Sequence, residues 1–146
     1  MPEIFDLVAC PTLSPCEWNE TLWKPLNNQK LPPGFRHARD PRYILRPEAI
    51  ESVFIMYRLT ADPKWQDMAW DMFQAVVKYS STELANAAVD DVTSTETSKT
   101  DSMESFWFSE TLKYFYLIFS EPDLISLDEY VLNTEAHPFR RLLSRD

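Results

Sequence analysis

The sequence predicts an all-α fold with a short β-prone segment near its C-terminal end. From residue 47 onward, apolar residues recur at intervals of three and four, which is the spacing of amphipathic helices. Residues 1–42 are instead rich in proline, which interrupts helices, and we expect loops with short elements there. With 45% hydrophobic and 14% aromatic residues, the 146-residue chain has ample material for the core of one domain.

The first two helices are predicted over residues 47–60 and from Asp62 onward. Pro47 suits the first turn of a helix, where its missing N–H costs little, and apolar residues follow it at helical spacing. Asp62 and Pro63 form an N-cap and first-turn pair. The apolar stripe of the second helix is expected to pack against neighbouring helices and to carry no chemistry. It comprises Trp65, Met68, Ala69, Met72, Phe73 and Val76.

A third helix is predicted to end near Phe119. Residues 80–100 are rich in Ser, Thr and Asp and predict a loop with one short strand, after which Asp101 and Glu104 resemble a capping arrangement. Apolar side chains cover nearly every direction around this helix, so we expect other elements to bury it. Residues 130–132 form a β-prone run. Three helices cannot cover so many aromatic faces, so we expect this fold to be incomplete.

The charge and the composition exclude several classes of function. A net charge of −9 argues against a nucleic-acid partner, which requires clustered Lys and Arg. Gly34 is the only glycine, so Gly-rich phosphate loops and dinucleotide fingerprints are absent. No apolar run reaches the roughly 20 residues that span a bilayer, and residues 1–15 do not resemble a signal peptide. We therefore expect no membrane span and no signal peptide in this chain.

The N-terminal residues offer two candidate modifications. Cys10 and Cys16 are too close to form a zinc site with only His37 and His137 scattered elsewhere, whereas a short disulfide between them is sterically possible. Free thiols are the alternative. Asn19 begins an Asn-Glu-Thr tripeptide, the acceptor pattern for N-glycosylation, which would agree with a parent protein in the secretory pathway.

Carboxylates on two of the predicted helices are the candidates for chemistry. Glu48 and Glu51 lie one turn apart on one face of the first helix, and such a pair is usually solvated, with Arg46 as a surface partner. Glu110 follows Phe106 by one turn within the most aromatic helix. It is either paired with the neighbouring Lys113 or part of a polar site beside an aromatic face, as in a sugar pocket.

Three blocks of the sequence together resemble the class I α-1,2-mannosidases, glycoside hydrolase family 47. These blocks are residues 43–58, 101–119 and 130–140, and they include Leu45-Arg46-Pro47-Glu48 and a run from Asn133 to Pro138. The order and spacing of the blocks also match, and residues 10–34 are more like the fungal members. The agreement of several blocks is more specific than one motif. Without the resemblance, Thr134-Glu135 could equally be a plain turn.

The resemblance implies that the chain is the C-terminal part of an (α/α)7 barrel that a terminal β-hairpin closes. Thr134 would be the direct protein ligand of calcium, through its carbonyl and hydroxyl oxygens, with waters and two sugar hydroxyls completing a shell that suits this ion. Glu48, Glu51, Glu110 and Glu135 would hold those waters or sugar hydroxyls. The implied reaction is the inverting hydrolysis of α-1,2-linked mannose in high-mannose N-glycans.

The resemblance also assigns roles to the residues around Glu48. Glu48 would be the general base, Arg46 would contact the substrate, Pro47 would orient Glu48, and Phe106 would stack on the mannose ring. The general acid would lie in upstream helices that this chain lacks, so we expect residues 1–146 alone to be inactive. The missing upstream barrel is thus an expected partner.

Two hypotheses of different classes follow. The first is a C-terminal segment of a mannosidase whose parent resides in the endoplasmic reticulum or Golgi, or is secreted. The second is a non-catalytic, calcium-dependent mannose-binding or interaction module, which mannose retention without hydrolysis would favour.

Overall fold

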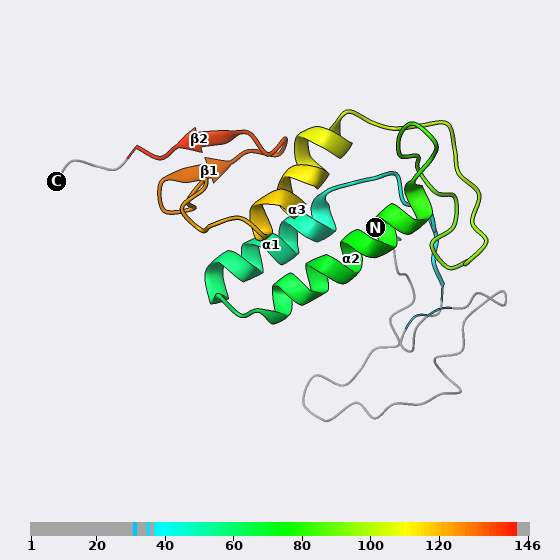
Figure 1. Cartoon of the computed structure of the whole chain (residues 1–146), viewed down its shortest axis with the longest axis horizontal. Helices are drawn as coiled ribbons and strands as arrows, with labels where there is room; N and C mark the ends of the chain where they lie inside the picture. The colour runs from blue at the N-terminus through cyan, green and yellow to red at the C-terminus, as the bar shows by residue number, and fades with distance from the viewer. Residues whose placement is uncertain (1–30, 32–34, 36, 143–146) are drawn as a thin grey trace, which may run out of the picture.

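The computed structural model describes residues 31, 35 and 37–142, and two of its helices form an antiparallel hairpin (Figure 1). These are α1 (Glu48–Thr60) and α2 (Lys64–Ser80). Ala61 ends α1 in the left-handed conformation (φ 53°), and its N–H donates to the Tyr57 carbonyl over 2.8 Å. The Asp62 carboxylate accepts a hydrogen bond from the Lys64 amide (3.1 Å), although Pro63 holds the N-cap position itself. Both predicted helices are confirmed to within about two residues, which is the usual uncertainty of a helix end.

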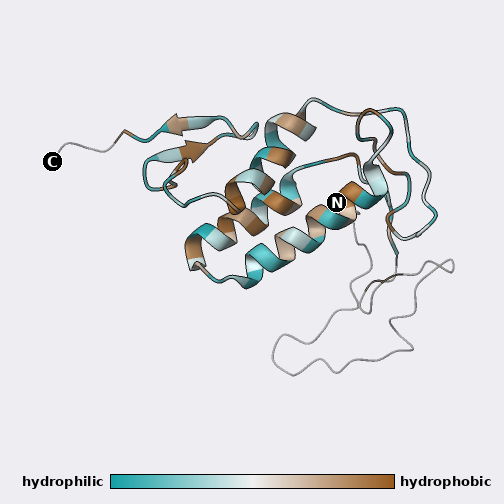
Figure 2. Ribbon diagram, in the orientation of Figure 1, coloured by the Kyte–Doolittle hydropathy of each residue, from teal (hydrophilic) through white to brown (hydrophobic). Residues whose placement is uncertain are grey.

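The apolar stripe of α2 packs as predicted except at Met68. Ala69 is fully buried, and Trp65, Met72 and Phe73 pack against the core. Met68 is exposed, so its predicted burial is wrong. The reason is that, within the described residues, the helices that α2 contacts are α1 and α3, and they leave its other side uncovered. Figure 2 shows hydrophobic and hydrophilic residues alternating along α1 and α2, as expected for amphipathic helices.

The third helix begins later than predicted and has two parts. Its first part is a π-helix, η1 (Trp107–Thr111), and α3 (Leu112–Ile118) continues it. The predicted start at Asp101 and Glu104 is wrong, because the preceding loop uses this stretch for its own hydrogen bonds. The Ser102 carbonyl accepts from the Ala88 amide over 2.9 Å. A π-helix turn is rare and is frequently found at functional sites.

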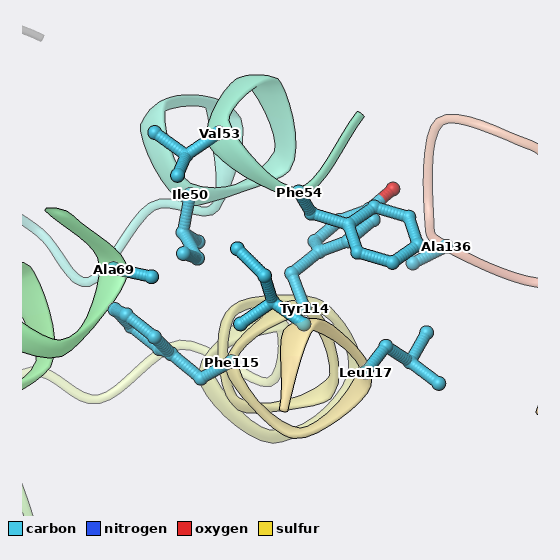
Figure 3. Close-up of a cluster of buried hydrophobic side chains, with 9 residues drawn as sticks. Ile50, Val53, Phe54, Ala69, Tyr114, Phe115, Leu117 and Ala136 are labelled. Carbon is cyan, nitrogen blue, oxygen red and sulfur yellow. The ribbon is translucent and has the colours of Figure 1, made fainter. Parts of the chain in front are cut away.

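The core lies where α1, α2 and α3 meet (Figure 3). The rings of Phe54 and Tyr114 lie 5.5 Å apart between centroids. The Arg58 guanidinium donates to the Leu117 carbonyl (3.0 Å), and the Gln66 side chain donates to the Ile118 carbonyl (2.9 Å), so both other helices satisfy the C-terminal end of α3. The buried cluster comprises Ile50, Val53, Phe54, Ala69, Tyr114, Phe115, Leu117, Ile118 and Ala136.

One face of η1 and α3 remains uncovered. Phe108 is 63% exposed and Tyr116 is 67% exposed, and Phe119 just beyond the helix is also exposed. Within the described residues this face stays exposed, which agrees with the expectation that three helices cannot cover so many aromatic faces. Burial is limited to the side that α1, α2 and the C-terminal hairpin cover.

The segment between α2 and η1 is a loop, as predicted, and its short strand is reduced to single bridges. Val89 pairs with Tyr43 and with Lys99 in isolated antiparallel bridges. The Tyr43 amide donates to the Val89 carbonyl (3.0 Å), and the Val89 amide donates to the Tyr43 carbonyl (2.9 Å). This contact fixes the chain two residues before Leu45, where the approach to α1 begins.

An antiparallel hairpin follows α3 and confirms the predicted β-prone run. Strands β1 (Tyr130–Leu132) and β2 (Pro138–Arg140) pair with Val131 opposite Phe139. The structure is thus mostly helical with one small antiparallel sheet, in agreement with the predicted class and hairpin. Within the described part of the chain, no helix is both long enough and apolar enough to cross a membrane.

Candidate active site

The N-terminal end of α1 presents two carboxylates and a guanidinium. Glu48 and Glu51 occupy the first turn, where the positive end of the helix dipole favours negative charge. The Arg46 guanidinium lies 3.6 Å from the Glu48 carboxylate, and both side chains are about half exposed, so this surface ion pair adds little stability. Arg46 also lies over the ring of Phe106, with 5.4 Å between the guanidinium carbon and the ring centroid. The structure therefore brings Phe106 to the first turn of α1.

Glu110 lies on η1 in the field of three other carboxylates. Partial burial raises the pKa of Glu110, and the negative charges of Glu135, Glu48 and Glu51 raise this pKa further, in that order of size. The positive charge of Lys113 lowers it. Four carboxylates from α1, η1 and the hairpin thus act on one region, and their repulsion indicates a site with excess negative charge.

One of the two interpretations of Glu110 was an ion pair with Lys113, but Lys113 has a different hydrogen-bond partner. Its ammonium group donates a hydrogen bond to the carbonyl oxygen of Ala136 over 2.8 Å. Among the described residues, no ion pair joins Lys113 to Glu110. The physical reason is that the buried Ala136 carbonyl needs a donor, and Lys113 reaches it from the adjoining turn of α3. Lys113 therefore attaches the hairpin turn to the helix.

The turn between β1 and β2 is organised by the side chain of Asn133. Its Oδ1 atom accepts hydrogen bonds from the amides of Glu135 (3.1 Å) and His137 (2.8 Å). Ala136 is in the left-handed conformation (φ 55°), and its methyl group is buried in the core. Thr134 and Glu135 are consequently held at the exposed tip of a turn that is anchored at its base. Glu135 also lies 3.6 Å from the His137 ring.

Glu51 is tied to α3 through a residue that the sequence analysis did not single out. The Tyr114 hydroxyl donates to Glu51 Oε1 over 3.2 Å. Burial, followed by the charge of Glu51, raises the pKa of Tyr114, so this phenol keeps its proton and remains a donor. Tyr114 follows Glu110 by four residues, and this spacing on one helix face was the signal that could have identified it.

The region around Thr134 offers oxygen donors, the ligand type of the calcium ion that the resemblance implies. No group of three or more His, Cys, Asp or Glu among the described residues is placed to hold a metal ion. Within residues 37–142 the Thr134 hydroxyl has no hydrogen-bond partner, so its oxygen is available as a ligand. An all-oxygen donor set in surplus negative charge fits calcium, which accepts carbonyl, hydroxyl and water oxygens.

The predicted residues before residue 31 cannot be placed. Cys10, Cys16 and Asn19 lie outside the described residues. The other predicted site residues, from Arg46 to Glu135, are all described, and Pro47 is the buried N-cap residue of α1.

A pH titration of stability tests the repulsion at Glu110. Because the folded-state pKa is raised, the folded protein binds a proton more tightly than the unfolded chain. Unfolding free energy should therefore fall as the pH rises from the ordinary glutamate pKa through the raised value. Glu110→Gln should flatten this slope, whereas Glu96→Gln, at an exposed position, should not. A slope that Glu110→Gln leaves unchanged would contradict the carboxylate cluster.

Clustered carboxylates beside an arginine and an aromatic ring on a helical scaffold are the composition of a carbohydrate-processing site. Comparison with known proteins agrees with this class. The family described as Glycosyl hydrolase family 47 matches residues 1–141, and the chain belongs to this family.

Similar proteins are named as mannosidases. A mannosyl-oligosaccharide 1,2-alpha-mannosidase of Arabidopsis thaliana is 45% identical over 113 residues, which is 77% of this chain and 17% of the relative. The Candida albicans enzyme of the same name is 43% identical over 116 residues, covering 73% of this chain and 20% of the relative. The structure of an alpha-1,2-mannosidase from Trichoderma reesei superposes with a TM-score of 0.66 at 45% identity, covering 68% of this chain and 22% of that one. The chain therefore spans less than a quarter of the length of these relatives.

Proposed function

We propose that this chain provides the general base and the calcium-binding floor of an inverting α-1,2-mannosidase that trims high-mannose N-glycans. The observation that carries the proposal is the convergence of Glu48, Glu51, Glu110 and Glu135 from three elements, beside Arg46 and Phe106, in a family 47 chain. The C-terminal hairpin would complete the floor of an (α/α)7 barrel whose remaining helices come from elsewhere in the enzyme. The parent protein would act in the secretory pathway or outside the cell.

The residues around Glu48 supply the nucleophilic half of the reaction. Inversion requires a carboxylate that takes a proton from water on the face of the sugar opposite the leaving group. Glu48 is half exposed, so water reaches its carboxylate, and Arg46 balances part of its charge. Phe106, whose ring lies beneath the Arg46 guanidinium, would offer an aromatic surface for a sugar ring.

Thr134 would hold calcium through its carbonyl and hydroxyl oxygens. The bound ion would orient sugar hydroxyls and neutralise part of the surrounding negative charge. Asn133 and Lys113 keep the turn in place, because the first accepts two amide hydrogen bonds and the second holds the Ala136 carbonyl. Glu110 and Glu135 would then hold waters or sugar hydroxyls around the ion.

The general acid would come from a part of the enzyme beyond the described residues. The resemblance assigns it to upstream helices, and the chain spans less than a quarter of its relatives. We therefore propose that residues 1–146 alone do not turn over α-1,2-linked mannobiose. A chimera in which residues 37–142 replace the aligned segment of the Trichoderma reesei enzyme should do so. An inactive but folded chimera that still binds calcium and mannose would favour the non-catalytic binding module instead.

Calcium titration tests the metal part of the proposal. Calcium should raise the melting temperature of the chain, because a ligand that binds only the folded state stabilises it. Binding should also release protons near the raised pKa of Glu110, since a nearby cation favours the ionised carboxylate. Magnesium should be much weaker, because it prefers a smaller and more regular shell.

Two matched threonine variants provide the control for this titration. Thr134→Val removes the hydroxyl ligand at nearly constant shape and should weaken calcium binding by about tenfold, which corresponds to about 1.4 kcal/mol. Thr95→Val makes the same change at an exposed position of the loop after α2 and should have no effect. Equal calcium affinity in the two variants would exclude Thr134 as the ligand.

A further inference from the structure

The peptide that leads into Glu48 has an unfavourable backbone conformation. Leu45 is in the left-handed region with φ at 64°, and its side chain is 0% exposed. A non-glycine residue rarely adopts this conformation unless its surroundings hold it there, and such residues cluster at active sites. Leu45 directly precedes Arg46 and lies three residues before Glu48. Its conformation therefore sets the direction in which the chain enters α1.

One buried hydroxyl holds this peptide. The Thr111 side chain donates to the Leu45 carbonyl oxygen over 2.6 Å, across 66 positions in the sequence. Thr111 is itself 0% exposed and is the last residue of the π-helix η1. A neighbouring contact supports the next peptide, because the Tyr43 hydroxyl donates to the Arg46 carbonyl over 3.3 Å. The buried Leu45 carbonyl would lose this partner if the Thr111 hydroxyl were removed.

We propose that Thr111 is a positioning residue for Arg46 and Glu48. By fixing the left-handed Leu45 peptide, its hydroxyl directs the first turn of α1 toward Glu110 on η1 and toward Phe106, which immediately precedes η1. The π-helix contributes because it presents Glu110 at the carboxylate site and Thr111 at Leu45, and Phe106 immediately precedes it as its N-cap residue. This inference rests on the proposed role of Glu48 as the base, although the positioning itself can be measured without catalysis.

Two pairs of variants isolate the hydroxyl. Thr111→Val and the unaltered protein differ by the hydroxyl at nearly constant shape. Thr111→Ala and Thr111→Ser differ by the hydroxyl in a smaller side chain, which keeps the comparison available if the valine variant does not fold. Thr60→Val is the matched control, because the Thr60 hydroxyl donates a 2.7 Å hydrogen bond to the Met56 carbonyl at the far end of α1.

Turnover is measured in the chimera with the Trichoderma reesei enzyme. Loss of the hydroxyl should lower kcat by about 10- to 100-fold in each pair, since misplacement of a reacting group by about 1 Å can cost 100-fold. Thr111→Ser and Thr60→Val should stay within about threefold of the unaltered chimera. Calcium affinity should change less than about threefold, because Asn133 and Lys113, and not Thr111, hold the turn that contains Thr134. A general loosening of the fold would instead lower both kcat and calcium affinity.

Hydrogen exchange of residues 43–51 in the 146-residue chain gives a second readout. The amide of Glu51 donates to the Pro47 carbonyl and that of Tyr43 to the Val89 carbonyl, so both report on local opening. Exchange should be about tenfold faster in Thr111→Ala than in Thr111→Ser. If the unaltered chimera shows no turnover, the proposed function is contradicted. The difference in hydrogen exchange between Thr111→Ala and Thr111→Ser still decides whether Thr111 is a positioning residue. Equal exchange within the Ala and Ser pair, or equal kcat within this pair in an active chimera, overturns the positioning role.

Discussion

Glu48→Gln in the Trichoderma reesei chimera should lower kcat by about 10² to 10⁴, which is the usual contribution of a general base. The change removes the charge that activates water but keeps the shape of the side chain. Glu48 is half exposed and its side-chain contact is the 3.6 Å ion pair with Arg46, so little stability should be lost. KM should stay within about threefold, because the substrate contacts assigned to Arg46 and Phe106 remain. Initial rates on α-1,2-linked mannobiose measure both constants.

The control for this experiment is Glu83→Gln, which makes the same change at an exposed position in the loop that follows α2. It should leave kcat and KM unaltered. If Glu48→Gln keeps its turnover, or loses it only through a large rise in KM, Glu48 is not the base. The chemical role would then pass to Glu51, Glu110 or Glu135, the three other carboxylates of the site.

Phe54→Ala should destabilise the protein by about 3 to 5 kcal/mol, which is the usual cost of deleting a buried aromatic ring. Phe54 is 0% exposed, and its ring contacts both Tyr114 and the Arg58 guanidinium, which lies 5.1 Å from the ring centroid. A loss of this size is a large part of the 5 to 15 kcal/mol that typically stabilises a domain, by rough estimate. Denaturant unfolding in the presence of calcium measures it.

Phe139→Ala is the control, since this ring on β2 is 57% exposed and its loss should cost less than about 1 kcal/mol. Phe54→Ala should also weaken the site, because Tyr114 holds Glu51 through its hydroxyl and packs on Phe54. Equal destabilisation by the two substitutions would contradict a core centred on the contact between α1 and α3.

The helices that are strongly periodic in sequence were predictable, and the segment before η1 was not. Helices α1 and α2 begin near prolines and carry regular apolar spacing, which is local information. The start of the third helix depends on hydrogen bonds between residues 88 and 102, which compete with the cap that Asp101 and Glu104 would have formed. The exposure of Met68 and Tyr116 likewise depends on which other elements pack against their helices, and the spacing of apolar residues along one helix does not specify this.

The site residues were found through their resemblance to a family, and the contacts that hold them came from the structure. From spacing alone, Glu48 and Glu51 were an ordinary solvated pair, and Glu110 had Lys113 as its nearest partner. In the structure, Lys113 donates a hydrogen bond to the Ala136 carbonyl. Glu110 instead experiences the negative charge of Glu135, which is 25 positions away in the sequence. Such long-range pairs have no signature in a single sequence.

The sequence by itself determined the helical class, the two amphipathic helices, the C-terminal β-prone run and the family, because these depend on residue type and local spacing. Only the tertiary structure decided that Thr111 meets Leu45 and that Tyr114 meets Glu51. It also decided that four carboxylates share one region. The physical reason is that a buried hydrogen bond or a raised pKa depends on which groups exclude water from one another. That depends on the packing of α1 against η1 and α3, and packing joins residues from distant parts of the chain.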